Sequence, residues 1–225
     1  MVPDQPEARI EVTTDGPYRI VGAPAVVRTS PLETEYGEPV AWAPDQPLDV
    51  PSDARLCRCG RSSTKPFCDD THLQSGFDGT EVADRGAYDD RAHAYRGRGL
   101  TLYDDLSLCT HAGFCGDRFQ TVWQMLPQAS DPEVRERIRH MTGLCPSGRI
   151  VTEVEGAETR DEPGFEPSIA VEENGPVWVR GKIPVVAADG TPYEVRNRQT
   201  LCRCGGSGNK PFCDGSHRTN GFRDG

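Results

Sequence analysis

Three cysteines and one histidine lie within sixteen residues near the C-terminus: Cys202, Cys204, Cys213 and His217. The surrounding stretch, 201–222, reads LCRCGGSGNKPFCDGSHRTNGF. Three thiolates and a neutral imidazole form a four-ligand set for a transition metal. An earlier stretch, 56–77, has the same residue types at the same spacing: Cys57, Cys59, Cys68 and His72. Because 14 of the 22 aligned positions are identical, we interpret the two stretches as two copies of one metal-binding module.

The spacing of the ligands helps to separate a single zinc ion from a cluster of two irons, since thiolates suit both. Structural zinc sites usually pair their ligands as C-x2-4-C. Here the first pair is C-x-C, and the other two ligands follow after eight and then three intervening residues. A two-iron cluster needs two ligand pairs, which the spacing supplies: Cys202 with Cys204, and Cys213 with His217. Zinc-bound loops are the alternative at both sites.

The run C-x-C-x8-C-D-G-S-H, preceded by Lys-Pro-Phe, resembles the CDGSH iron–sulfur (mitoNEET-like) family over residues 16–80 and 175–225. The resemblance implies, in each copy, a [2Fe–2S] cluster bound by three cysteines and one histidine on a β-sheet platform. The first copy departs from the motif, because Asp70 and Thr71 stand where the second copy has Gly215 and Ser216. Its ligands are intact, so we expect a cluster there too, with a potential lowered by the Asp70 carboxylate.

The single histidine ligand of each copy has a physical consequence for electron uptake. A neutral imidazole in place of a thiolate raises the reduction potential relative to an all-cysteine cluster. The second ring nitrogen can take a proton, which would couple electron uptake to pH. Lys65 and Lys210 lie just before the third cysteine of each copy. They either tune the electrostatic field at the cluster or are solvated loop residues.

A third cysteine group lies between the two copies: Cys109, Cys115 and Cys145. Bacterial ferredoxins use C-x2-C-x2-C with a distant Cys-Pro, and here Ala112 occupies the second cysteine position. Three thiolates can hold three irons, so we expect a [3Fe–4S] cluster. His111 would instead complete a [4Fe–4S] site, although it lies beside the vacant position. A zinc ion bound by these four residues is a further alternative.

The same segment, residues 94–156, resembles single-cluster bacterial ferredoxins and a small divergent 4Fe–4S domain with the pattern C-x-H-x3-C…CPSG. The nine cysteines of the chain thus divide into three groups of three with none to spare. In a reducing cytosol that division favours three metal sites over disulfides. His93 and His140 have no partners at ligand spacing, and we expect them to face solvent or to pack.

Composition limits the fold and the partners. The hydrophobic content is only 35%, with 24 Gly and 19 Pro, which favours small metal-held modules over one large core. The net charge of −10 disfavours nucleic acid as a partner. No apolar run approaches the ~18–20 residues of a membrane span, and the N-terminus lacks a signal pattern. We therefore expect a soluble, cytoplasmic protein without a membrane partner.

The elements that position these residues follow from local patterns. Turn residues and β-branched runs predict strands at 18–21, 25–29, 99–103, 150–154 and 177–179. Asp131 as N-cap, Pro132 and an apolar i, i+4, i+7 pattern predict a helix over 131–142 that Gly143 ends. Residues 1–9 are predicted to be a flexible lead-in. The Pro-rich stretch 31–51, which contains the 14 residues by which the first copy exceeds the second, is predicted to be a surface loop.

These elements predict an α+β fold of mostly small β modules. We expect a first CDGSH-type [2Fe–2S] module at 10–86, a ferredoxin-like α+β domain at 87–156, a linker at 157–174 and a second CDGSH-type module at 175–225. Since the family's usual unit is a homodimer, the two copies in one chain are expected to form an intramolecular pseudo-dimer. The protein would then be a monomer with an internal pseudo-two-fold axis.

Outside the cysteine groups the chain has no nucleophile elbow, phosphate-binding glycine loop, or flavin or nicotinamide fingerprint. We therefore expect an electron carrier and not an enzyme, with two [2Fe–2S] clusters and one [3Fe–4S] cluster. It would pass single electrons to a partner such as an oxygenase, and its acidic surface suits a basic patch on a reductase or acceptor enzyme. Iron–sulfur cluster storage or transfer, redox sensing and a zinc-stapled scaffold are the alternatives.

Overall fold

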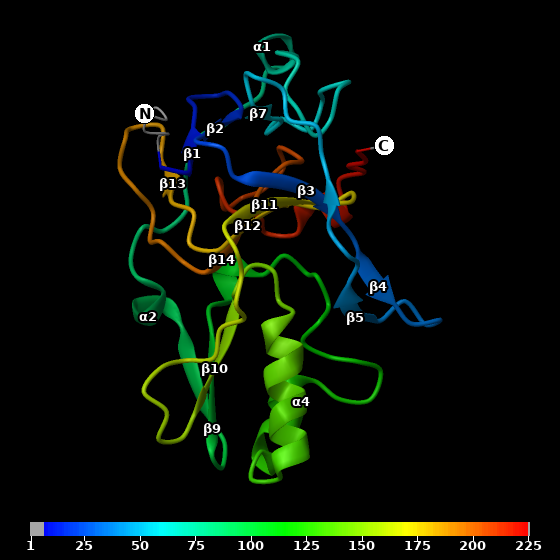
Figure 1. The fold of residues 1–225 in the computed structure, drawn as a ribbon, viewed down its shortest axis with the longest axis vertical. Coiled ribbons are helices and arrows are strands. Elements are labelled where there is room, and N and C mark those ends of the chain that lie inside the picture. Colours follow the sequence, from blue (N-terminus) through cyan, green and yellow to red (C-terminus); the bar gives the residue numbers. More distant parts are fainter. Residues whose placement is uncertain (1–6, 225) are drawn as a thin grey trace, which may run out of the picture.

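The computed structural model describes residues 7–224, which form two lobes. In Figure 1 the upper lobe contains strands from both ends of the chain, and the lower lobe contains the middle of the chain, with α4 beside β9 and β10. The predicted α+β class of small, mostly β units is confirmed. No helix among residues 7–224 has the length and apolar character needed to cross a membrane.

The strands are β1 (Arg9–Val12), β2 (Tyr18–Val21), β3 (Ala25–Thr29), β4 (Pro31–Glu33), β5 (Pro39–Trp42), β6 (Gln46–Pro47), β7 (Arg55–Leu56), β8 (His93–Arg96), β9 (Leu100–Asp104), β10 (Ile150–Val154), β11 (Ser168–Glu172), β12 (Val177–Arg180), β13 (Val185–Val186) and β14 (Arg198–Leu201). The helices are α1 (His72–Ser75), α2 (Tyr88–Arg91), α3 (Val122–Met125) and α4 (Pro132–Gly143). Short 3₁₀ turns are η1 (Leu106–Leu108), η2 (Leu126–Gln128) and η3 (Ser216–Arg218).

The two sequence repeats exchange strands in the upper lobe. One sheet has the order β13-β1-β2-β7 and the other β14-β12-β11-β3-β6. Strand β13, from the second repeat, pairs parallel with β1, and β3, from the first repeat, pairs parallel with β11. One hydrophobic cluster therefore contains fully buried side chains of both repeats, among them Ile10, Tyr18, Ile169 and Leu201. Neither repeat completes its sheet or its core alone.

The predicted linker at 157–174 needs correction in its C-terminal part. Residues Ser168–Glu172 form β11, and all five are buried because the strand is the centre of the five-stranded sheet. A strand covered on both faces shows a continuous apolar run in place of alternation, and Ile169, Ala170 and Val171 are that run. Residues 155–167 contain neither helix nor strand. Of the flexible lead-in predicted for 1–9, residues 1–6 lie outside the described part of the chain, and Arg9 already belongs to β1.

The predicted loop at 31–51 contains a hairpin of β4 and β5, followed by β6 on the edge beside β3. The Trp42 indole packs between Trp178 of the upper lobe and Phe114 of the lower lobe, with ring centroids 4.9 Å apart in both pairs. Its Nε1 donates a hydrogen bond to the Leu144 carbonyl at 2.9 Å. The extra residues of the first copy thus join the two lobes.

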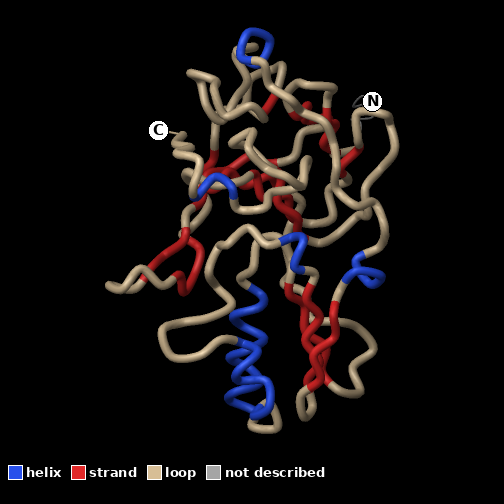
Figure 2. Tube along the Cα trace, turned by 180° about the vertical axis from the view of Figure 1, so that it is seen from behind, coloured by secondary structure: helices blue, strands red, loops and turns tan. Residues whose placement is uncertain are grey.

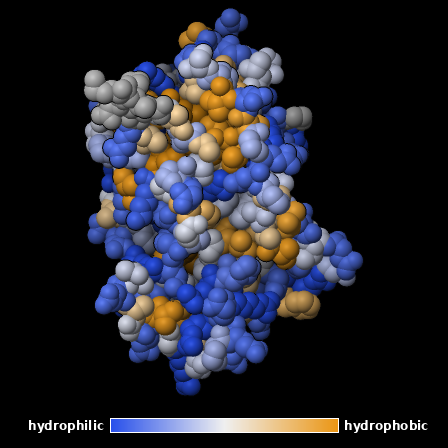
Figure 3. All heavy atoms as spheres, viewed as in Figure 1, coloured by the Kyte–Doolittle hydropathy of each residue, from blue (hydrophilic) through white to orange (hydrophobic). Residues whose placement is uncertain are grey.

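The lower lobe is a three-stranded sheet, β10-β9-β8, packed against α4. Its core includes Leu100, Leu102, Ile138 and Ile150, all at most 1% exposed. The predicted helix is confirmed, with Asp131 as N-cap accepting from the Glu133 amide at 2.8 Å, and it extends through Gly143. Figure 2 shows this helix from behind, beside the strands of the lower lobe. On the face in Figure 3, hydrophobic residues gather over the upper lobe and its junction with the lower one.

Candidate metal centres

The second copy brings its four predicted ligands together in the predicted pairs. The Sγ atoms of Cys202 and Cys204 lie 3.8 Å apart, and Cys213 Sγ lies 3.4 Å from His217 Nδ1. A tetrahedral metal with bonds of about 2.3 Å to sulfur places two thiolates about 3.8 Å apart. Each pair is therefore spaced as two ligands of one metal ion.

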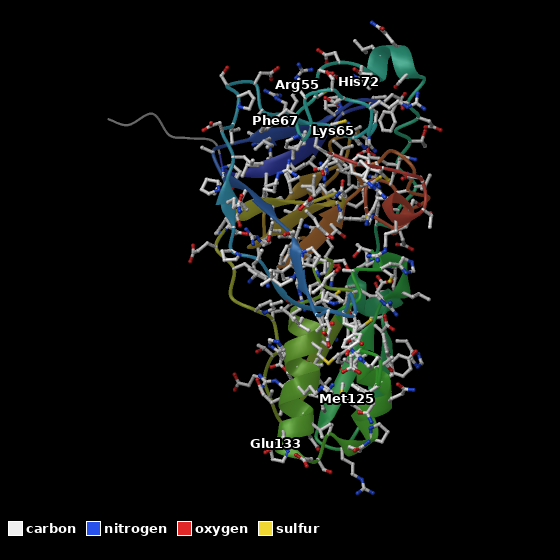
Figure 4. The ribbon with its side chains drawn as sticks, turned by 90° about the vertical axis from the view of Figure 1, so that its right-hand side faces the viewer. Arg55, Lys65, Phe67, His72, Met125 and Glu133 are labelled. Atoms are coloured by element: carbon white, nitrogen blue, oxygen red, sulfur yellow. The ribbon has the colours of Figure 1, made fainter. Side chains whose placement is uncertain are left out.

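The first copy has the same geometry in a more exposed position. The Sγ atoms of Cys57 and Cys59 lie 3.7 Å apart, and Cys68 Sγ lies 3.4 Å from His72 Nδ1. Figure 4 shows His72 and Lys65 at one end of the molecule, with the lower-lobe residue Met125 towards the other end. Cys68 and His72 are partly exposed, whereas Cys213 and His217 are buried.

The pKa shifts of three of the ligands, Cys59, Cys213 and His217, also fit metal binding. Burial raises the pKa of the Cys59 thiol to about 11 and raises that of Cys213 too. Buried thiols of this kind stay protonated unless a metal cation stabilises the thiolate. Burial, followed by the charges of Arg218 and Arg203, lowers the pKa of His217 to about 4. The imidazole is then neutral at physiological pH, which is the ligating form.

Two residue types that the sequence analysis did not single out hold each ligand loop in shape. Ser62 Oγ donates to the Phe67 carbonyl, and Ser207 Oγ donates to the Phe212 carbonyl, both at 2.7 Å. The aspartate after the third cysteine accepts two backbone amides across the loop: Asp69 from Ser63 and Thr71, and Asp214 from Gly208 and Ser216. The sequence indicated these serine and aspartate residues only through their identity in the two copies.

The departure of the first copy from the motif has a local explanation. Asp70 adopts a left-handed φ of 65°, and its carboxylate forms an ion pair with Arg55 of β7. The hydrogen bond from Arg55 lowers the pKa of Asp70. The carboxylate also lies close to the ligands, since its oxygen, Cys68 Sγ and the His72 ring nitrogen fall within 4.8 Å of one another. Arg55, which sequence reasoning missed, compensates the added negative charge.

The two copies meet at their C-x-C elements. Cys59 and Cys204 form an isolated antiparallel β-bridge. The next residue in each copy is a glycine with positive φ: a Cβ on Gly60 would lie 2.6 Å from the Cys204 carbonyl oxygen, and a Cβ on Gly205 would lie 2.7 Å from that of Cys59. Glycine is required at both positions because any side chain would separate the two sites. The two CDGSH-like loops are therefore direct neighbours.

The third group also converges, as predicted. Cys109, Cys115 and Cys145 line one cavity of about 250 Å³ in the lower lobe. Burial raises the pKa of Cys115, and the neighbouring Cys145 adds to the effect. Arg149, which sequence reasoning missed, donates from Nη1 to Cys109 Sγ at 3.0 Å and binds Asp104 through Nε and Nη2 at 2.6 and 2.9 Å. Three thiolates around one cavity beside a guanidinium suit an anionic cluster.

The remaining histidines are His111, His93 and His140, and His111 lines the same cavity as the three cysteines. The His111 ring packs against the backbone of Gly215 in the second copy, where an added Cβ would overlap His111 Cδ2. His93, on β8, is exposed and lies edge-on to Tyr95 at a centroid distance of 4.5 Å. His140 is exposed on α4. Both side chains lie at the surface, one of the two positions expected for them, and their lack of a ligand role stays a prediction.

Two arginines from the second repeat hold the loop that carries Cys145. Arg196 donates to the carbonyls of Ser147 and Gly148 at 3.2 and 2.6 Å. Arg198, only 1% exposed, donates from Nη1 to the carbonyls of Thr142, Gly143 and Cys145 at 2.8, 2.7 and 2.8 Å. The position in the first copy that corresponds to Arg198 is Asp53. The two repeats differ at this position, but no local sequence pattern indicates what Arg198 contacts.

Comparison with protein families agrees with the three sites. The model of the iron-binding zinc finger of CDGSH type matches residues 15–73 and again 174–218. A divergent 4Fe–4S mono-cluster model matches residues 95–154, between the two. The resemblances expected from the motifs are thereby confirmed. No curated protein and no solved structure matched the chain.

Proposed function

The chain contains two CDGSH-type iron-binding segments that flank a divergent 4Fe–4S mono-cluster segment, and we propose that it is a multi-cluster iron–sulfur electron-transfer protein. The observation that carries the proposal is that three thiolate sites are built into one packed structure. The two CDGSH-type loops touch at Cys59 and Cys204, and the middle segment touches the second loop at Gly215. Bound iron–sulfur clusters would supply reversible one-electron oxidation and reduction.

Each set of ligands has a proposed occupant. The two CDGSH-type sites would each hold a [2Fe–2S] cluster: Cys57, Cys59, Cys68 and His72 in the first, and Cys202, Cys204, Cys213 and His217 in the second. Cys109, Cys115 and Cys145 would hold a [3Fe–4S] cluster. The packing of the His111 ring against Gly215 supports three protein ligands there. A [4Fe–4S] cluster with His111 as fourth ligand is the alternative, since His111 also lines the cavity.

The strand exchange supports an intramolecular pseudo-dimer. Strand β3 of the first repeat pairs parallel with β11 of the second, and the corresponding strand β13 of the second repeat pairs parallel with β1 of the first. The Tyr18 hydroxyl of the first repeat donates to the Cys202 carbonyl of the second at 2.8 Å. We propose a monomer with modules at 10–86 and 87–156 as predicted. The second CDGSH-type module would start at β11, because that strand corresponds to β1.

The proposed function is tested on anaerobically purified protein. Iron and sulfide analysis, with electron paramagnetic resonance of oxidised and reduced samples, should show two [2Fe–2S] centres and one [3Fe–4S] centre. Stopped-flow mixing of the reduced protein with an oxidised ferredoxin-type acceptor should then show fast electron loss with all iron retained. A colourless, zinc-containing protein would contradict the proposal.

A second candidate, cluster transfer, is favoured by the partial exposure of Cys68 and His72. Incubation of the oxidised protein with an apo-ferredoxin separates the two functions. Rapid loss of the first-copy cluster to the acceptor, with an intact cluster at Cys202–His217, would support transfer. Retention of both clusters would support electron transfer alone.

Arg149 provides a prediction specific to the middle site. The Arg149→Met variant removes a cation and an N–H donor from Cys109 Sγ, both of which stabilise the reduced, more negative cluster. We expect the reduction potential of that centre to fall by on the order of 50 mV, with the other two potentials unchanged. Redox titration followed by paramagnetic resonance measures all three centres.

The Arg149→Lys variant is the control for this prediction, since it keeps the charge near Cys109 but cannot maintain the two-point contact with Asp104. The reduction potential of the middle centre should therefore fall less in Arg149→Lys than in Arg149→Met. If Arg149→Met binds the cluster normally and its potential is unchanged, the guanidinium has no tuning role.

A further inference from the structure

The middle site and the second CDGSH-type site are joined by a direct contact between their ligand loops. Gly215 lies between the ligands Cys213 and His217, and its amide donates to Cys213 Sγ at 3.4 Å. The ring of His111 and the carbonyl of Thr110 cover this glycine so closely that a Cβ there would overlap His111 Cδ2 and lie 3.2 Å from the Thr110 oxygen. His111 itself is two residues from Cys109, a ligand of the middle site.

A second contact fixes the same two segments. Asn209, in the ligand loop of the second copy, donates from Nδ2 to the Ser107 carbonyl at 2.9 Å. Ser107 belongs to η1, which leads directly into Cys109. Buried arginine bonds hold the other side of the middle site to the same repeat, from Arg198 to the Cys145 carbonyl. The two sites thus share a rigid, packed boundary.

The first CDGSH-type site has a different environment at the corresponding position. Asp70 replaces Gly215, and its side chain is 47% exposed and paired with Arg55. The first repeat does reach the lower lobe, but through its hairpin, where Pro39 Cγ would lie 3.0 Å from a Cβ on Gly113. That contact is made by β5 and not by the loop between Cys57 and His72. The sequence difference between Gly215 and Asp70 therefore separates an enclosed site from a peripheral one.

We infer that His111 couples the middle centre to the second CDGSH-type centre, and that these two sites exchange electrons directly while the first exchanges them through the second. The inference rests on the proposed electron-transfer function. With clusters bound, one electron would pass between the centre held by Cys109, Cys115 and Cys145 and the centre at Cys202–His217, so that one is oxidised as the other is reduced. No covalent bond forms or breaks. His111 is a positioning residue, since electron tunnelling weakens steeply when a packed contact opens into a gap.

The His111→Ala variant tests the inference. Electrons are introduced by a flash-activated photoreductant into fully loaded protein, and freeze-quench paramagnetic resonance follows their distribution among the three centres. We expect equilibration between the middle and second centres to slow by about tenfold, equivalent to about 1.4 kcal/mol of activation free energy. The iron and sulfide content and the types of the three clusters should stay unchanged.

Matched controls separate the contact from general perturbation. The exposed His93→Ala variant in the same segment should equilibrate at the native rate. Gly215→Ala, which forces the ring of His111 away, should slow the same step, whereas Asp70→Ala at the corresponding position should not. The Gly215 variant keeps the inference testable if removal of His111 prevents loading of the middle site.

Two results would overturn the inference. Native equilibration rates in both the His111→Ala and Gly215→Ala variants would show that electrons do not cross this contact. Conversion or loss of the middle cluster in His111→Ala, with native rates in Gly215→Ala, would make His111 a ligand. Failure of the native protein to reduce any external acceptor would instead count against the proposed function, and it leaves the internal rates measurable.

Discussion

The Arg198→Met variant is expected to lose the middle cluster while both CDGSH-type clusters remain. The guanidinium is buried and donates to three carbonyls at the C-terminal end of α4 and the start of the Cys145 loop, and to the Ile150 carbonyl at 3.3 Å. A methionine fills the volume but leaves these acceptors without a donor, and each buried unpaired group costs about 1–3 kcal/mol. We expect the middle segment to be destabilised by about 3–5 kcal/mol.

Iron and sulfide counts with paramagnetic resonance measure which clusters are retained, and urea unfolding followed at each cluster's absorption measures stability. The control is Arg61→Met, because Arg61 is exposed and, among residues 7–224, its side chain donates only to the Ser75 carbonyl, at 2.8 Å. That variant should behave like the native protein. A fully loaded Arg198→Met protein of native stability would show that the lobes are held together by other contacts, such as that of Trp42.

The Glu172→Gln variant is expected to be more stable than the native protein at pH 8 by about 3 kcal/mol. Glu172 ends β11 and is 7% exposed. Its Oε2 has no hydrogen-bond partner among the described residues. Burial raises the pKa of this carboxyl to about 7, although the charges of Arg203 and Arg218 oppose the shift. Ionisation of Glu172 in the folded protein therefore creates a carboxylate that burial leaves poorly solvated.

The sign of the pH dependence follows from the raised pKa. Between the ordinary value of 4.5 and about 7, the folded state keeps a proton that the unfolded state has released. The stabilisation from this group is fully present below pH 4.5 and is lost as the pH rises through 7. Glutamine does not ionise, so the advantage of the variant should be large at pH 8 and small at pH 5.

Anaerobic urea unfolding of the loaded proteins at pH 5 and pH 8 measures this difference. Glu173→Gln is the matched control, since Glu173 is the exposed neighbour of Glu172 and should change stability little at either pH. An equal difference between native protein and Glu172→Gln at both pH values would mean that Glu172 ionises normally.

Features encoded within a short stretch of chain could be predicted from the sequence alone. Ligands within one loop are close along the chain, so spacing predicted the pairs Cys202 with Cys204 and Cys213 with His217, which the structure places at 3.8 and 3.4 Å. The helix α4 was predictable for the same reason, because its N-cap and apolar period lie within twelve residues. The CDGSH and divergent 4Fe–4S resemblances also rest on short, contiguous motifs.

Contacts between segments distant in the chain could not be predicted from the sequence. Pairing of β3 with β11 joins Ala25 to Ser168, and no periodicity encodes a partner so distant in the chain. The same holds for Arg198 beneath the Cys145 loop. In the sequence, Asp70 in place of Gly215 is only a small departure from the motif. In the structure, the contact of Gly215 with His111 encloses the second CDGSH-type site, whereas the first site, with Asp70, lies at the surface. Local spacing specifies which atoms can bind a metal; packing between distant segments specifies which sites are neighbours.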